Sequence, residues 1–182
     1  PSSFVRSVLV TRRGDLWVGT DKGAGVFDPR SGRYTTFGSE SGLIGSSVRR
    51  IYEDPDGTLW FCCDRWPNPD FTGGVSCFHE GKWNSYGLKD GLPSDYVLSY
   101  LRDSRGRQWV ATAKGIARKQ GDIWISGQGP GLTRQESVQL IEELPDGNLL
   151  ADCLSGFWLL QGDVWRQVSS ESTIMCSTRD RE

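Results

Sequence analysis

The sequence has 182 residues and a formal net charge of −2, with 21 basic and 23 acidic residues interspersed, which argues against nucleic acid as the main partner. Gly accounts for 23 of the 182 residues, which is a larger share than the typical value of about 7%. The chain also contains eight Trp. This composition favours short strands and tight turns. No stretch shows the sustained 3.6-residue period of a long helix or approaches the roughly 20 apolar residues of a membrane span.

A fourfold repeat runs through the chain. Its copies open with VRSVLVTRRGDLW at residue 5, VRRIYEDPDGTLW at 48, VLSYLRDSRGRQW at 97 and VQLIEELPDGNLL at 138. In each copy the turn Gly lies nine positions after the leading Val, and three positions further on stand Trp17, Trp60, Trp109 and Leu150. The Gly marks a hairpin between a first and a second strand. We therefore expect these four residues to be buried as the blade core at one equivalent position.

Each copy continues with two more predicted strands. The third strands read AGVFD, GVSCF, GIARK and GFWLL, and the fourth begin with GRYTTF, GKWNSY, GDIWIS and GDVWRQV. Four antiparallel strands in roughly 40 to 50 residues form one blade of a β-propeller. The sequence therefore predicts an all-β propeller unit over 1–182, with blades at about 5–47, 48–96, 97–137 and 138–172. The tail, 173–182, resembles the start of a fifth repeat or a closing strand.

Four repeats leave three ways to complete a ring. The chain is a fragment of a larger propeller, or it pairs with another copy, or its tail completes a four-bladed ring. A chain that begins with Pro1 is expected to be a processed or excised piece. The first two arrangements leave an open blade edge with unpaired strand groups, so self-association is also expected.

The turn "DPDG" also imitates the start of a calcium loop, through Asp54, Asp56 and Gly57. The equivalent turns read TRRG, DSRG and LPDG, so the pair of Asp residues is not retained. A calcium loop needs several oxygen ligands in a fixed order, whereas a hairpin needs only the Gly and a polar neighbour. We therefore predict a hairpin here.

The cysteines permit a second metal hypothesis. A thiolate site could be assembled from Cys62, Cys63, Cys77 and His79. However, Cys63 and Cys153 align with Thr20 and Thr112, small residues of the second strand. Free Cys packs as a small hydrophobe, and no second spaced pair supports zinc. We predict that Cys63 and Cys153 are buried and reduced, with no metal and no cofactor.

The second repeat carries an insertion, DRWPNPDFTGG, between its second and third strands. Loops at this place share one face of a propeller with the blade linkers, and ligands usually bind such loops on a rigid scaffold. The candidate ligand-binding residues are Arg65, Trp66, Asn68, Asp70 and Phe71, with Lys22 and Lys114 from the equivalent loops. Trp66 could stack on a sugar or hold a peptide. The alternative is that the insertion only covers a blade edge, with Trp66 packed down.

The stretches KDGLPSDYVLSYLRDSRGRQWVAT and GDLWVGT resemble the repeats of two-component regulator propellers, whereas WFCC and LLADC depart from that pattern. In that family the repeats form seven-bladed propellers outside the membrane, in sensor kinases and hybrid regulators that detect glycans and other nutrients. The resemblance implies a non-enzymatic sensory module in the periplasm or outside the cell. It also implies a small-molecule or glycan ligand. Five Cys, an odd number, leave a cytoplasmic location open.

Two rival functions stay open. One is a protein–protein interaction scaffold that holds a partner domain. The other is a lyase resembling streptogramin lyases, which depend on a His general base and a metal. The single His of this chain, His79, suits that chemistry poorly, and no Ser/His/Asp or paired-carboxylate constellation can be assembled. We therefore predict no catalytic residue.

Overall fold

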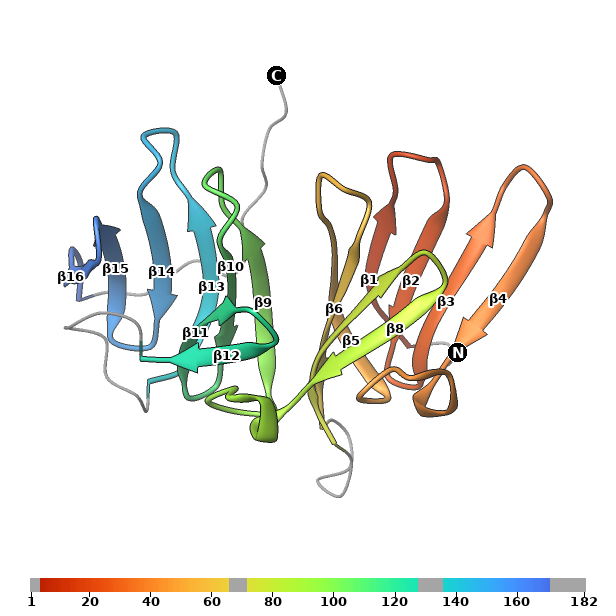
Figure 1. Ribbon diagram of the computed structural model, residues 1–182, viewed down its shortest axis with the longest axis horizontal. Helices are drawn as coiled ribbons and strands as arrows, with labels where there is room; N and C mark the ends of the chain where they lie inside the picture. Colours follow the sequence, from red (N-terminus) through yellow and green to blue (C-terminus); the bar gives the residue numbers. More distant parts are fainter. Residues whose placement is uncertain (1–3, 66–71, 128–135, 171–182) are drawn as a thin grey trace.

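The computed structural model describes residues 4–65, 72–127 and 136–170. It contains four antiparallel sheets, each made of four strands paired in sequence order (Figure 1). Blade 1 consists of β1 Val5–Val10, β2 Leu16–Thr20, β3 Gly23–Asp28 and β4 Arg33–Phe37. Blade 2 consists of β5 Ser47–Glu53, β6 Leu59–Asp64, β7 Gly74–His79 and β8 Lys82–Tyr86. Blade 3 consists of β9 Val97–Arg102, β10 Gln108–Thr112, β11 Gly115–Gln120 and β12 Ile123–Ser126, and blade 4 of β13 Val138–Glu143, β14 Leu149–Cys153, β15 Gly156–Gln161 and β16 Val164–Gln167.

The first hairpin has the same construction in every blade. Gly57 has a φ of 81°, in the left-handed region that favours glycine, and its N–H donates to the carbonyl of Asp54 at 2.9 Å. The other three turns place Gly14, Gly106 and Gly147 at φ of 90°, 76° and 78°. The turn at Asp54 is thus a hairpin, and Asp54 is 2% exposed.

The blades stack face to face in the order of the sequence, as the propeller prediction requires (Figure 1). The first strands, β1, β5, β9 and β13, are neighbours from blade to blade, so they form the inner edge of the row. Three clusters of buried side chains lie between successive blades. The predicted all-β propeller fold with four-stranded blades is confirmed.

One predicted core position differs between blades. Trp17, Trp60 and Trp109 are 4%, 3% and 2% exposed, each on the face that its blade turns toward the next blade. Leu150 holds the equivalent place but is only partly buried, whereas its neighbour Leu149 is 0% exposed and packs toward blade 3. The expectation for Leu150 was therefore wrong. Alternate strand residues point to opposite faces, and no blade follows blade 4 within the described residues to cover Leu150.

The opposite end of the row is also uncovered. On the outer face of blade 1, Val8, Val10, Phe27 and Tyr34 are 60%, 64%, 37% and 52% exposed. Blades 1 and 4 lie at the two ends of the row in Figure 1. Association through this face stays a prediction.

The cysteines within the described ranges are free and buried. Cys63 and Cys153 are both 0% exposed, in second strands. Burial raises the pKa of the Cys63 and Cys153 thiols to about 12, which makes both poor nucleophiles at neutral pH. Among the described residues, no group of three or more His, Cys, Asp or Glu side chains is placed to hold a metal.

Candidate functional site

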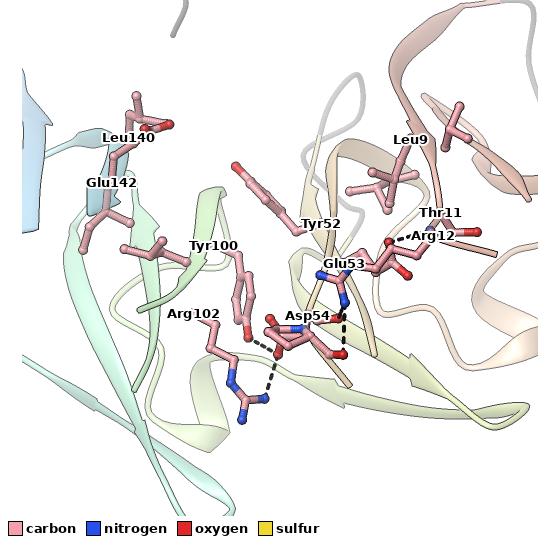
Figure 2. A pocket seen from close by; sticks show the side chains of 15 residues that line it. Leu9, Thr11, Arg12, Tyr52, Glu53, Asp54, Tyr100, Arg102, Leu140 and Glu142 are labelled. Atoms are coloured by element: carbon pink, nitrogen blue, oxygen red, sulfur yellow. Dashed lines mark hydrogen bonds and ion pairs between the residues drawn. The ribbon is translucent and has the colours of Figure 1, made fainter. Parts of the chain in front are cut away.

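A cavity of about 460 Å³ opens where the four first strands end and their hairpins begin. Residues of all four blades line it, from the last part of β1, β5, β9 and β13. Figure 2 shows Tyr52 and Tyr100 in its middle, with Leu9 on one side and Leu140 on the other. The ring centroids of the two tyrosines are 5.9 Å apart. The walls of this cavity are therefore shared among the four blades.

The carboxylate of Asp54 organises one wall of this cavity. Its Oδ2 accepts hydrogen bonds from the Trp60 indole at 3.1 Å and the Tyr100 hydroxyl at 2.8 Å. Arg102 Nη1 and Gln108 Nε2 reach the same oxygen at 3.2 and 3.3 Å. One donor belongs to blade 2 and three belong to blade 3, so a buried charge joins the two blades. A buried carboxylate is tolerated when it is paired and hydrogen-bonded in this way.

Two side chains of this network face the cavity with different roles. Tyr100 is held neutral, because burial and then the nearby charge of Asp54 raise its pKa. Arg102 keeps 32% of its side chain exposed while Nη1 also bonds Asp56 at 3.1 Å. Its position along the repeat is held by Val10 in blade 1 and Glu53 in blade 2. A partly exposed guanidinium in a fixed orientation can donate to an oxygen of a ligand.

The wall between blades 1 and 2 is held by Arg12 and Glu53. The backbone N–H of Arg12 donates to Glu53 Oε2 at 3.0 Å. Arg12 Nη1 donates to the carbonyls of Asp54 and Pro55 at 3.2 and 3.0 Å. Both side chains border the cavity beside the apolar Leu9 (Figure 2). This wall therefore offers a cation, a carboxylate and an apolar surface close together.

Tyr52 supplies an unused polar group. Its hydroxyl is buried and makes no well-formed hydrogen bond within the described ranges. Burial and then the nearby Cys62 raise the pKa of Tyr52 to about 12, although the charge of Arg50 and weak hydrogen-bond contacts with the Arg50 side chain and the Tyr100 backbone oppose this rise. A buried unpaired hydroxyl costs free energy that a ligand or a water can recover. The tyrosine lies among the cavity residues in Figure 2.

The cavity combines aromatic rings with fixed charged groups, a combination that is typical of small-molecule binding pockets. His79, the single histidine, lies outside it. Its side chain is 46% exposed, and its Nδ1 is 3.0 Å from Thr58 Oγ1. The arrangement therefore supports binding more directly than acid–base catalysis.

Arg65, the candidate of the insertion that lies within the described residues, is at the other end of the strands. Arg65 forms an ion pair with Asp95 of the next blade linker, at 3.3 Å. The hydroxyl of Thr72 donates to the carbonyl of Ile44 in the preceding linker, at 2.7 Å. The stems of the insertion thus lie between two blade linkers. The remaining candidates fall outside the described residues: Trp66, Asn68, Asp70 and Phe71.

Lys22 and Lys114 occupy equivalent turns between second and third strands. Their backbone N–H groups donate to the hydroxyls of Thr20 and Thr112 at 3.1 and 3.2 Å. Both lysines are on the loop side of their blades, away from the cavity. The structure brings neither of them to the cavity wall, and their role in binding stays a prediction.

Sequence reasoning missed the cavity because it examined the hairpins as turns only. The available signal was the residue before each turn, which is Thr11, Asp54, Asp103 and Leu144 in successive repeats. Two copies hold a carboxylate followed six positions later by a Trp. That pairing indicates a buried hydrogen bond near the inner edge of the blade.

The fold is that of a β-propeller module with a cavity at its inner edge. Residues 1–22 and 42–65 match the model of the family described as Two component regulator propeller. These two stretches match repeats of this family, which confirms the resemblance found in the sequence. No curated protein matches the sequence. In the described part of the chain, no helix has the length and apolar character needed to cross a membrane.

Several solved structures share the fold. The extracellular domain assigned to a hybrid two component system of B. thetaiotaomicron is 19% identical with a TM-score of 0.70, over 89% of this chain and 22% of that one. PorZ, a surface component of the type-IX secretion system of Porphyromonas gingivalis, is 15% identical with a TM-score of 0.70, over 92% and 27%. An ancestral GH74 enzyme is 18% identical with a TM-score of 0.66, over 90% and 25%. The chain spans about a quarter of these proteins, and at such identities the likeness shows the fold alone.

Proposed function

We propose that this chain is a non-enzymatic ligand-sensing module whose ligand occupies the cavity at the inner edge of the blades. The observation that carries this proposal is the buried Tyr52 hydroxyl, which lacks a well-formed hydrogen bond, in a cavity that the partly exposed Arg102 also lines. The repeats of the two-component regulator propeller family support a sensory role. By the same resemblance, the module works in the periplasm or outside the cell.

A glycan is the ligand class that fits the cavity best. The partly buried side chains of Tyr52, Leu9 and Leu140 offer apolar surface. Arg102 and Glu53 offer a donor and an acceptor at the border of the cavity. Sugars present hydroxyl groups around an apolar ring face, so they use both kinds of group. A partner protein domain is the rival occupant, and it would need to insert a polar side chain to reach Tyr52.

Calorimetric titration with a panel of neutral oligosaccharides tests the proposal. Tyr52→Phe removes only the hydroxyl and is expected to weaken binding by about 1 kcal/mol, or roughly fivefold. Tyr34→Phe is the matched control, because Tyr34 is 52% exposed on the outer face of blade 1. Equal affinity of Tyr52→Phe and the unaltered protein, or no binding by any member of the panel, would contradict the cavity proposal.

The same titration distinguishes the cavity from the loop face. If the insertion binds the ligand, Trp66→Ala should lower the affinity by about 2 kcal/mol and leave the melting temperature nearly unchanged. If Trp66 covers a blade edge, its loss should instead lower stability by about 3 kcal/mol. The cavity proposal expects Trp66→Ala to leave affinity unaltered.

A further inference from the structure

A second cavity lies on the hairpin side between blades 1 and 2. Its volume is about 240 Å³. Thr11 and Glu53 border both this cavity and the larger one, so the two adjoin. The side chain of Trp17 forms part of its wall. Comparison with blades 2 and 3 shows that a hydrogen-bond acceptor for the Trp indole is missing here.

In blades 2 and 3 the Trp at this position has an internal acceptor. The indole N–H of Trp60 donates to Asp54 Oδ2 at 3.1 Å, and that of Trp109 donates to Asp103 Oδ2 at 2.9 Å. Each carboxylate stands six residues before its Trp. The hydrogen bond is therefore a repeated feature of the blade.

Blade 1 keeps the Trp but not the acceptor. Thr11 stands where blades 2 and 3 have Asp, and its Oγ1 accepts from the backbone N–H of Asp15 at 3.1 Å. This reproduces the bond from Arg107 N to Asp103 Oδ1, at 2.8 Å. Thr11 has no second side-chain oxygen to take the place of Asp103 Oδ2, which accepts the Trp109 indole N–H in blade 3. Trp17 is 4% exposed, and its indole N–H has no acceptor among the described residues.

The charge at this place is also reversed between blades 3 and 1. In blade 3, Arg107 Nε bonds Asp103 at 2.6 Å, and the guanidinium lies 5.2 Å from the centre of the Trp109 ring. Blade 1 has Asp15 at the position of Arg107. The hairpin of blade 1 therefore presents a carboxylate where blade 3 supplies its own cation.

The rest of the cavity rim is acidic. Besides Asp15, its carboxylates are those of Glu53, Asp56 and Glu80. Its basic lining residues are Arg13 and His79, and His79 Nε2 lies 4.0 Å from Glu80 Oε1. Burial acts against ionisation of Asp56, but hydrogen bonds from Thr58 and the charge of Arg102 lower its pKa below the ordinary value. Asp56 is therefore charged at neutral pH. An anionic ligand is disfavoured here, and a cationic one is attracted.

We propose that this second cavity binds a hydroxylated amine, a ligand group that carries a hydroxyl close to an ammonium. The hydroxyl oxygen accepts the Trp17 indole N–H in place of the missing carboxylate oxygen. The ammonium lies against the rim carboxylates, in the place that Arg107 takes in blade 3. The site does not depend on the ligand of the larger cavity.

Two-dimensional NMR of the indole N–H signals tests this site directly, with the Trp17 signal assigned by its loss in Trp17→Phe. Protonated glucosamine is the probe, since it carries hydroxyls and an ammonium. Glucose supplies hydroxyls without the charge, and propylamine supplies the charge without hydroxyls. We expect glucosamine to shift the Trp17 signal with at least about tenfold higher affinity than either comparison compound, which corresponds to about 1.4 kcal/mol. An unmoved Trp17 signal, as for a site that holds only water, or equal binding of glucose, would overturn the proposal.

A double variant transplants the blade 3 arrangement into blade 1. Thr11→Asp with Asp15→Arg supplies both the internal acceptor and the internal cation, so glucosamine binding should fall at least about tenfold. Asp15→Asn alone is a milder test and should weaken glucosamine binding severalfold without affecting glucose. Asp146→Asn, in the first hairpin of blade 4, is its matched control. Unchanged glucosamine affinity in Asp15→Asn would refute the role of the rim charge even if the double variant failed to fold.

Discussion

The junction between blades 1 and 2 is packed with aromatic rings, whereas the junction between blades 2 and 3 contains a buried carboxylate. In the first, Trp17 stacks on Phe37 with ring centroids 5.4 Å apart and meets Phe61 at 5.3 Å. Phe61 also contacts Trp83 at 4.9 Å. In the second, Trp60 stacks on Tyr100 at 4.6 Å, and both side chains also bond Asp54.

The comparison shows that one repeat spacing supports two kinds of blade contact. The aromatic junction is stabilised by the burial of apolar area, and this hydrophobic stabilisation does not depend on the orientation of the side chains. The polar junction depends on one oxygen with four donors, so it fixes the directions of Tyr100 and Arg102. Such fixed directions suit a wall of a binding cavity. The aromatic junction instead leaves the Trp17 indole N–H without an internal acceptor.

The largest effect is expected from breaking the aromatic junction. Phe61 is 0% exposed and lies between Trp17 and Trp83, so Phe61→Ala should leave a void. We expect a loss of about 4 kcal/mol in the free energy of unfolding, measured by denaturant titration. A loss below about 1 kcal/mol would show that this junction is loosely packed.

Removing the carboxylate at the other junction should cost slightly less. Asp54→Ala leaves four donors without their shared acceptor, and Arg102 keeps its contact with Asp56. We expect a loss of about 3 kcal/mol in the same titration. The cavity should also lose ligand affinity, because Tyr100 and Arg102 are no longer oriented. Retained stability with unaltered affinity would mean that Asp54 does not organise the wall.

The smallest expected effect compares the two tryptophans directly. Trp60→Phe removes a donor to Asp54, whereas Trp17→Phe removes an N–H that has no internal acceptor. Both lose similar packing, since the two residues are 3% and 4% exposed. Thermal or chemical melts should therefore find Trp60→Phe less stable than Trp17→Phe by about 1 kcal/mol. The reverse order would indicate that Trp17 has an acceptor in solution.

The sequence by itself determined the blades. A constant interval from Val to Gly to Trp fixed where hairpins form, because a left-handed turn residue and alternating apolar side chains act locally. The alignment of Cys63 and Cys153 with Thr20 and Thr112 likewise indicated their burial, since residues at one strand position share one environment.

Only the tertiary structure decided what lies between the blades. Leu150 has the same local pattern as Trp109, but its burial depends on whether another blade covers that face. The three hydrogen-bond donors of blade 3 that contact Asp54 are 46 to 54 positions away in the chain. No local sequence pattern therefore predicts these contacts. The larger cavity is likewise shared by the inner strands of all four blades. Local periodicity fixes which face of a strand is apolar, whereas the stacking of blades decides which neighbour that face meets.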